Sequence, residues 1–597
     1  MWYNALYKEV LDMFLKKTKQ SSGRTLLTIA QGYRDPITKK SRQKTVINLG
    51  YLDELVEKYE DPIAHFEALA KEMTIQQKEA NEARLVNLGT ISLDEELGMN
   101  EDALKYLGYL PLSYLYHQLR MREFWVNRQR NFDISYSLND IMQLLIYMRV
   151  LEPGSKRHAF MHKHRLPFNL KCEEHDIYRA LDIFDRYKED FLLHVHEEVR
   201  LHYGRKTEYV FYDVTNFYFE IDEVDDFRKR GFCKHRSRNP LVQMGLLLDD
   251  KALPITYELF EGNTHDSQTI MPILQEVRRR YGIKRLITVA DKALNSGDNI
   301  AFMMVKGDGF IFSQKVKGAA EELVDYVFDP TGYKTVTDKA FSEGKDKEEA
   351  NFYYKSRPYP QEFQVTHADN KKRPIPIDVK QIVCFNRDYA NRQRHKRREA
   401  IAKANELIRN PGRLKASEEY GAKRYIANID VDAKTGECLA PHKFAYLDEE
   451  RIREDEKYDG FYVLITSEVD TPDLEIIRQY HNLWEIEKSF RVTKHELRSR
   501  PVYLSLEEHI RAHFLTCFMA LLMVRLLCLA LDNKFGPEPV INSLRKYQAC
   551  FLKENIYRTT YFDEVLAAIQ KAFGMKLNRK YITRGDLRSL TAQTKKH

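Results

Sequence analysis

Little in this 597-residue chain points to secretion or to disulfide bonding. Cysteine is scarce, with 7 residues scattered along the sequence. No two of them form a Cys-x-x-Cys pair, so neither a zinc ribbon nor a disulfide framework is indicated. The opening residues, MWYNALYKEV, lack the basic and then apolar layout of a signal peptide. We therefore expect reduced thiols in a soluble, intracellular protein.

Long apolar runs are also rare. The one membrane-like stretch is 514–531, FLTCFMALLMVRLLCLAL, with Arg525 inside it. A bilayer span needs ~20 apolar residues, and a central Arg costs ~2.5–3.5 kcal/mol on insertion. The stretch therefore predicts a buried core helix. Low-complexity tracts and internal repeats are missing as well, which argues against fibrous and solenoid proteins.

What the chain does have is a large apolar share, 43%, beside 31% charged residues, a composition typical of folded domains. The net charge of +7 is small but concentrated. Segment 387–415 holds ten Lys and Arg against three acids, and segment 576–597 holds seven against one. Two such patches favour contact with a polyanion at defined places; a solvated helix and a loose tail are the alternative.

The hydrophobic patterning changes along the chain. Runs rich in β-formers at 25–33 and 42–49 flank a polar turn and predict a hairpin, and a helical stretch follows at about 53–86. Segments with helical periodicity fill 92–205. From about 207 strands alternate with helices, which predicts a mixed sheet with helices on its faces.

Three acids stand out by position. Asp213 lies inside a strand, Asp291 ends a later strand, and Glu487 lies on a long helical stretch that begins after residue 472. Carboxylates are the ligands that Mg²⁺ prefers, and two ions about 3.5–4 Å apart can activate water and stabilise the leaving oxygen of a phosphodiester. Spacing alone is a weak argument among 88 acids. Asp291 can instead cap the next helix, and Asp213 can be an ordinary hydrogen-bonded acid.

The helical stretch adds a pattern. Tyr480, Leu483, Glu487 and Lys494 fall within about 60° of one another at ~100° per residue, and Arg491 lies close to that face. One stripe can then offer a metal-binding carboxylate with cations that grip phosphate. An exposed Glu–Arg pair worth ~0.3–0.5 kcal/mol is the alternative.

Three ordered segments carry a recognisable pattern: 231–270 (GFCKHRSRNPLVQMGLLLDDKALPITYELFEGNTHDSQTI), 290–302 (ADKALNSGDNIAF) and 480–503 (YHNLWEIEKSFRVTKHELRSRPVY). They resemble the DDE transposases of bacterial insertion sequences, in the group marked by Tyr-x2-Arg-x3-Glu-x6-Lys. The first is similar to the stretch after that group's first catalytic Asp, the second to its second-Asp motif and the third to its Glu-helix signature. The resemblance covers about 207–535 and, more loosely, the N-terminal hairpin.

The resemblance implies that Asp213, Asp291 and Glu487 form the catalytic, metal-binding triad. It also implies that Tyr480 and Lys494, the signature Tyr and Lys, help to bind transposon-end DNA.

The chain departs from the signature where Leu483 replaces the Arg, and Arg478 and Arg491 are the candidates to compensate. We expect further DNA contacts from the loop after the first acid strand, from the residue after the second Asp and from the first basic segment. These side chains are Lys234, Arg236, Arg238, Lys292, Arg394, Lys396, Arg397 and Arg398.

The implied activity is DNA transposition: cleavage of the ends of an insertion sequence and their joining to target DNA by two Mg²⁺ ions, for which Mn²⁺ can substitute. The expected partners are double-stranded DNA, namely terminal inverted repeats and target, and a second copy of the chain in a paired-end complex. The implied location is the bacterial cytoplasm, at the nucleoid when bound. A non-mobile RNase H-like nuclease on branched DNA or hybrids, and a catalytically impaired regulator that binds the ends, are the alternatives.

Together, pattern and resemblance predict the α/β class: an RNase H-like mixed-sheet catalytic domain interrupted by a mixed β/α insertion domain, with N-terminal hairpin and helical domains and a helical C-terminal region. The expected segments are a hairpin and helix module (1–90), a helical, DNA-binding domain (91–205), the first part of the catalytic core (206–318), the insertion domain (319–457), the second part of the core (458–535) and a helical region with a basic tail (536–597).

Overall fold

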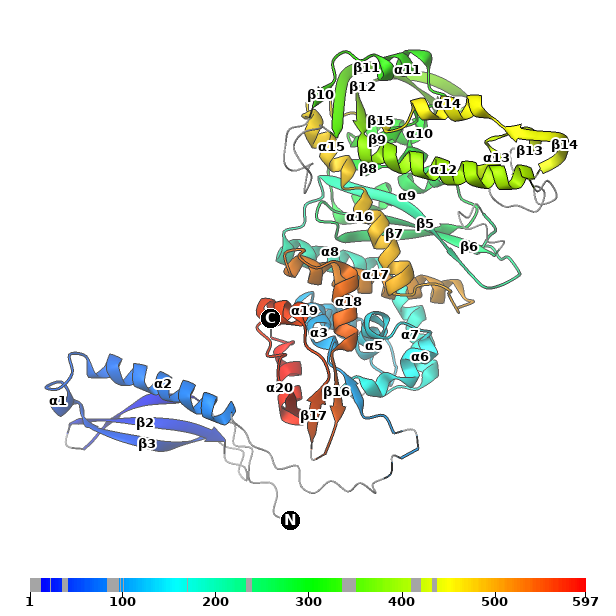
Figure 1. The fold of residues 1–597 in the computed structure, drawn as a ribbon. Helices are drawn as coiled ribbons and strands as arrows, with labels where there is room; N and C mark the ends of the chain where they lie inside the picture. Colours follow the sequence, from blue (N-terminus) through cyan, green and yellow to red (C-terminus); the bar gives the residue numbers. More distant parts are fainter. Residues whose placement is uncertain are drawn as a thin grey trace. The chain divides into compact units, whose positions relative to one another are not determined.

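The computed structural model describes residues 12–21, 23–34, 41–82, 96, 98–99, 101–168, 170–231, 239–335, 351–409, 420–431, 438–553 and 555–596. The chain divides into two compact units, Met1–Met99 and Asn100–His597 (Figure 1). Each unit has its own hydrophobic core.

The first unit is a three-stranded antiparallel sheet covered by helix. Its elements are β1 (Met13–Lys19), β2 (Thr25–Arg34), β3 (Ser41–Tyr51), α1 (Leu52–Leu55) and α2 (Pro62–Glu82). Leu27, Leu55 and Phe66 are its buried core. The predicted hairpin is confirmed as β2 and β3, whereas β1 was missed because the lysine-rich MFLKKTK carries little apolar alternation.

The second unit is built on a nine-stranded mixed sheet in the order β10-β11-β12-β15-β9-β8-β5-β6-β7. The pairs β5–β8 and β8–β9 are parallel, and the other neighbours are antiparallel. The strands are β5 (Tyr209–Tyr218), β6 (Leu241–Leu248), β7 (Pro254–Glu261), β8 (Ile287–Ala290), β9 (Gly309–Gln314), β10 (Lys334–Thr335), β11 (Phe352–Thr366), β12 (Lys372–Asn386) and β15 (Phe461–Thr466).

Both faces of this sheet are apolar, so helices cover both. Alternating residues of β5 join different cores, with Val210 and Tyr212 in one and Phe211 and Phe217 in the other. The first core also takes in α9 (Asp266–Tyr281), α10 (Gly297–Val305) and α11 (Glu321–Phe328). The second is continuous with α17 (Glu507–Ala530) and the helices that precede the sheet.

Those preceding helices fill the segment where helices were predicted. They are α3 (Tyr109–Gln118), α4 (Met121–Gln129), α5 (Leu138–Leu151), α6 (Lys156–Met161), α7 (Glu174–Arg186) and α8 (Lys188–Tyr203). The long apolar helix α17 runs among them, with 94% of its most apolar window buried inside the protein. Its length and composition would suit a membrane span, but it is a core helix, as predicted.

Segment 319–457 differs from the separate insertion domain that was expected, because β10, β11 and β12 extend the same sheet. Beyond them lies a smaller module with its own core: α12 (Arg387–Arg409), α13 (Tyr420–Lys423), β13 (Ile426–Val431), β14 (Cys438–Leu447) and α14 (Glu449–Lys457).

The C-terminal region is not purely helical and does not end in a loose tail. Its elements are α18 (Pro537–Lys546), β16 (Gln548–Phe551), β17 (Ile556–Thr559), α19 (Glu564–Phe573), β18 (Tyr581–Thr583) and α20 (Arg584–Gln593). The three strands form a sheet with β4 (Leu104–Tyr106), from the start of the second unit. The short strands were missed because four-residue runs give little periodicity.

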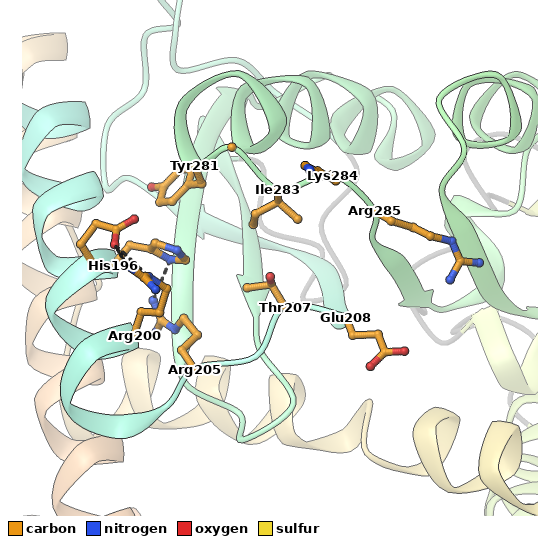
Figure 2. Close-up of a pocket in the computed structure, with 11 residues that line it drawn as sticks. His196, Arg200, Arg205, Thr207, Glu208, Tyr281, Ile283, Lys284 and Arg285 are labelled. Atoms are coloured by element: carbon orange, nitrogen blue, oxygen red, sulfur yellow. Dashed lines mark hydrogen bonds and ion pairs between the residues drawn. The ribbon is translucent and has the colours of Figure 1, made fainter.

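A buried ion pair fixes the entry into β5. Arg205 and Asp249 are 1% and 0% exposed, and the Arg205 Nε to Asp249 Oδ2 distance is 2.8 Å. Arg205 also donates to the carbonyl of Pro254. It approaches Nδ1 of His196 (Figure 2). The link therefore ties the end of α8 to the β6–β7 turn. His196 and Arg205 line a cavity of about 600 Å³ that none of the predicted site residues reaches.

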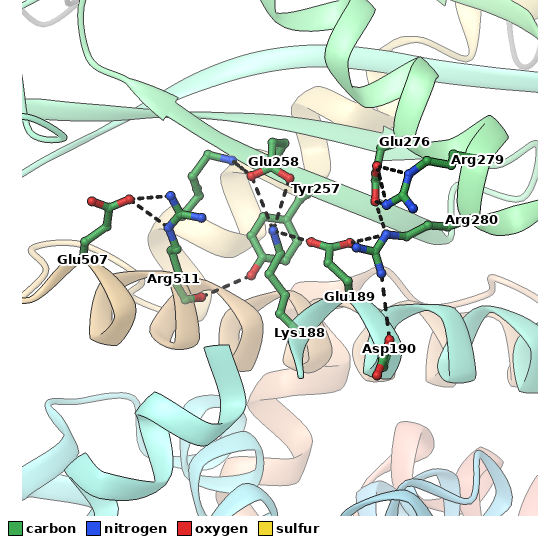
Figure 3. Close-up of polar contacts among 11 residues, drawn as sticks. Lys188, Glu189, Asp190, Tyr257, Glu258, Glu276, Arg279, Arg280, Glu507 and Arg511 are labelled. Carbon is green, nitrogen blue, oxygen red and sulfur yellow. Dashed lines mark hydrogen bonds and ion pairs between the residues drawn. The ribbon is translucent and has the colours of Figure 1, made fainter. Parts of the chain in front are cut away.

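A second polar contact joins α8 to the sheet and to α9. Lys188, almost buried, lies 3.3 Å from Glu258 of β7 and 3.0 Å from Glu189, and Arg280 of α9 approaches Glu189 (Figure 3). Because these charges are partly shielded from water, the pairs help to set the orientation of α8 on the sheet.

The buried Arg205–Asp249 pair gives a stability prediction. Asp249→Ala leaves Arg205 charged and buried without its acid, so the free energy of unfolding should fall by about 3–5 kcal/mol in urea denaturation. The control Arg279→Gln breaks an exposed pair with Glu276 and should cost at most about 1 kcal/mol. A loss for Asp249→Ala no larger than that of the control would contradict the assignment.

Candidate active site

Two of the three predicted acids meet at neighbouring strand ends. The parallel pairing of β5 with β8 sets Phe211 opposite Val289. Asp213 and Asp291 each follow these partners by two residues, so the register brings them side by side. Parallel strands end at the same edge of a sheet, which is where α/β proteins commonly hold ligands.

The Asp291 carboxylate is held in one orientation. Its Oδ1 accepts hydrogen bonds from the Lys292 amide at 2.7 Å and from the Ser313 hydroxyl of β9 at 2.8 Å. Asp291 thus caps the short helical turn Lys292–Leu294, the alternative role that its sequence position suggested. Asp213, half-buried, accepts from the Val214 amide at 2.8 Å. In both acids the carboxylate therefore accepts from the amide of the next residue, and Asp291 is held by the Ser313 hydroxyl as well.

The helix that carries the third acid is interrupted, although one continuous helix was predicted. It consists of α15 (Asp473–His481), α16 (Trp484–Arg491) and a π-helical turn, Val492–Glu496. At the break the amides of Leu483 and Ile486 donate hydrogen bonds to the carbonyls three residues earlier, those of Tyr480 and Leu483. This is the tighter 3₁₀ pattern. A uniform 100° step per residue therefore does not describe this segment.

The signature residues nevertheless share one pocket. It has a volume of about 1110 Å³ and is lined by Asp213, Asp291, Glu487, Tyr480, Leu483, Lys494, Lys292, Trp484 and Arg500 among others. Glu487 is exposed on α16 and lines this pocket together with the two strand acids. The fold thus brings together residues that are 274 positions apart in the sequence, Asp213 and Glu487.

Two signature side chains are anchored beside the acids. Burial raises the pKa of Tyr480, and the nearby Asp291 raises it further, so the hydroxyl keeps its proton. Lys494 donates to the Thr215 hydroxyl on β5, the strand of Asp213, and its Nζ lies 5.2 Å from the centre of the Phe217 ring. A hydroxyl donor and a cation therefore flank the carboxylates.

Other predicted contacts lie elsewhere. Arg491 is exposed but does not line the pocket. On α12, Arg394, Lys396 and Arg398 are exposed, away from the pocket. Lys292 is exposed at the pocket itself. Lys234, Arg236 and Arg238 lie outside the described residues.

Arg397 needs a correction, because it is not an open cation. Its side chain is 8% exposed and donates to both oxygens of Asp459, which is itself buried. In the sequence, the cations of this basic run could not be told apart. A helix that packs on its own domain buries one face, and a cation on that face is not exposed. Arg397 stabilises the α12 module and does not offer a free guanidinium to phosphate.

Two pocket features were missed in the sequence. Arg500 lines the pocket, near the place where the signature Arg is replaced by Leu483, whereas Arg478 pairs with Glu475. Ser313 orients Asp291. Arg500 stands inside the quoted motif 480–503 and could have been suspected there; nothing in the sequence marked Ser313.

The Arg inside the apolar helix α17 explains how α16 is held. Arg525 donates to the Glu485 carboxylate at 2.8 Å, to the Glu485 carbonyl at 2.9 Å and to the Ser489 hydroxyl at 2.7 Å. Glu485 and Ser489 bracket Glu487 on the same helix. The signal available in the sequence was Arg525 itself, a charged residue in an otherwise apolar run. In the structure it anchors the helix that carries Glu487.

The donor set suits hard divalent cations, since it consists of carboxylates in one solvent-filled pocket. The three acids do not form a closed trio. Among the described residues, only Glu152, His158 and His162 bring three ligand atoms within 4.8 Å of one another. In that cluster Arg165 donates to both Glu152 oxygens, at 3.3 and 3.2 Å, so it is an ion-pair network.

Comparisons with known proteins agree with this geometry. One family model, the IS1634 family transposase N-terminal domain, matches residues 15–84, and another, the transposase DDE domain, matches 205–523, more than half of the chain. No curated protein matches.

The similar solved structures are distant. A piggyBac transposase synaptic complex with hairpin DNA is 7% identical over 82% of this chain and 85% of its own, with a TM-score of 0.32. A pre-cleavage Mos1 transpososome is 12% identical over 32% and 66%, with a TM-score of 0.13. A Mos1 paired-end complex with the left transposon end is 13% identical over 43% and 70%, with a TM-score of 0.14.

The DDE-domain match spans all three acids of the pocket, and DDE transposase domains use divalent metal ions. The amino-terminal match covers most of the strands and helices of the first unit. The chain therefore belongs to the DDE transposases, and it is a DNA transposase of the IS1634 type of insertion sequence.

Proposed function

We propose that Asp213, Asp291 and Glu487 are the catalytic acids with which this transposase cleaves the ends of its own insertion sequence and joins them to target DNA. The observation that carries the proposal is the β5–β8 register, which sets two of these acids side by side in the pocket that the third also lines. The strand order β7-β6-β5-β8-β9, antiparallel and then parallel, supports an RNase H-like core.

Asp213, Asp291 and Glu487 would hold two divalent ions, Mg²⁺ or Mn²⁺, whose chemistry when bound would be to activate a water or a 3′-hydroxyl and to stabilise the leaving oxygen. The other residues act on the DNA itself: Lys494, Lys292 and Arg500 neutralise phosphate charge around the reacting group.

The protonated Tyr480 hydroxyl donates a hydrogen bond to a phosphate oxygen or to a base edge near Asp291. The exposed α12 cations (Arg394, Lys396 and Arg398) bind the phosphates of flanking DNA without reading its sequence, and salt weakens this binding. Because two ends must be paired, we propose that the active assembly is a dimer on terminal repeats and target DNA. The α12 module is inserted between β12 and β15, within the segment 319–457 where an insertion domain was expected.

The acids can be tested directly by end cleavage. Asp291→Asn and Glu487→Gln keep the side-chain shape but remove the charge that binds metal, so cleavage of a labelled end duplex with Mg²⁺ should fall at least ~10³-fold. Glu475→Gln, which changes a half-buried acid on α15 paired with Arg478, is the matched control and should cleave normally. Near-normal rates for the first two variants would reject the triad.

The Arg525 anchor gives a separate prediction. Arg525→Met removes the hydrogen bonds from α17 to Glu485 and Ser489, while Lys488 still pairs with Glu485. It should lower the free energy of unfolding by about 1.5–3 kcal/mol. The cleavage rate should fall more than DNA affinity does, and a higher Mg²⁺ concentration should be needed, because Glu487 loses its fixed position. Arg511→Gln, on the exposed side of the same helix, serves as the control. Equal Mg²⁺ requirements in the two variants would show that Arg525 does not position the acid.

A further inference from the structure

A third, smaller cavity of the large unit is lined by cations. Its volume is about 290 Å³, and it lies between the end of α5, the start of α6, α17 and the segment 498–504. The basic side chains in its wall are Arg149, Lys156, Arg498, Arg500 and His513. Among the described residues, no Asp or Glu lines it.

Lys156 is buried there without an acid beside it. It is 4% exposed, and its Nζ lies 3.3 Å from both His513 Nδ1 and the Thr516 hydroxyl. His513 Nε2 faces the carbonyl of Ser499 at 3.2 Å, so it carries the hydrogen and leaves Nδ1 to accept. Both partners of Lys156 are therefore neutral. Burial and the neighbouring Arg149 lower the pKa of Lys156 to about 7.

Arg149 is the second buried cation of the cavity, 4% exposed. It donates to backbone carbonyls only, those of Leu497, Arg498 and Gly154. Its Nε has no partner among the described residues. Burying a charge is costly unless an opposite charge or strong hydrogen bonds compensate it. Two such cations with neutral partners therefore leave the cavity short of one anion.

We propose that this cavity binds a phosphate group of the DNA backbone. Guanidinium and ammonium groups are the side chains that suit phosphate, and the volume is several times the ~30 Å³ share of one water. Arg500 lines both this cavity and the active-site pocket, so a strand leaving the catalytic acids can enter it. The inference rests on the DNA binding of the proposed function.

A phosphate bound in this cavity would hold the DNA backbone in a fixed position on one side of the cleavage point. The cavity joins α5 and α6, in the helical part of the unit, to the chain that follows the Glu487 helix. A phosphate bound there would couple the helical part to the position of the scissile bond, without reading any base.

The first test measures anion binding by the full chain. At pH 6.5, inorganic phosphate should raise the melting temperature of the wild type. Lys156→Met should melt higher than the wild type without phosphate, because a buried charge is gone, and should respond less to phosphate. Arg157→Gln, the neighbouring exposed cation of α6, should behave as the wild type. A Lys156→Met protein that melts lower and keeps the full phosphate response would overturn the proposal.

The second test uses an end duplex titrated at several salt concentrations. Each phosphate contact contributes about 0.9 to the slope of log K against log salt, so Lys156→Met should lower that slope by about 1 and Arg157→Gln should not. Phosphate binding at the cavity with an unchanged DNA slope would overturn the assignment to DNA. Asp291→Asn should keep both responses while losing cleavage, so failure of the catalytic proposal and failure of this one are distinguishable.

Discussion

Parallel hydrogen bonding between β5 and β8 is the constraint on which the active site depends. The last paired residues of the two strands are Phe211 and Val289, and Asp213 and Asp291 each lie two residues beyond them. A shift of one residue would turn one acid into the apolar core formed by Tyr212 and Ala290. The buried residues on both faces of β5 make such a shift costly, so packing of the sheet also fixes the chemistry.

The third acid reaches the same place by a different route. Glu487 lies on an eight-residue helix between a tight turn and a π-helical turn, which gives it little regular backbone to hold its position. Arg525 compensates by binding this helix to α17, a long and largely buried helix of the unit. Arg525, the charge that argued against a membrane span, therefore links the core helix α17 to the helix that carries Glu487.

The sequence predicted much of this fold because the sheet strands are strongly patterned and the motifs around Asp213, Asp291 and Glu487 are distinctive. It could not predict the break before Trp484, since the apolar spacing from Tyr480 to Lys494 suits a regular helix equally well. Nor could it separate Arg397 from its exposed neighbours, because the partner, Asp459, is 62 residues away. The strands β16, β17 and β18 were missed for a related reason: they belong to a sheet that β16 completes by pairing with the distant β4, a contact that local pattern does not contain.

That pairing has a consequence for biosynthesis. β4 at residues 104–106 finds its partner at 548–550, and the Tyr109 and Ser113 hydroxyls bond to Thr591 and Thr594. About 440 residues must be translated between the two halves, which takes roughly 20–90 s at typical rates of synthesis. The catalytic sheet can form during that interval, whereas the helical part keeps an open edge until the last segment emerges. In a nascent chain, the sheet that carries Asp213 and Asp291 can therefore form before the small sheet of β4, β16, β17 and β18 is complete.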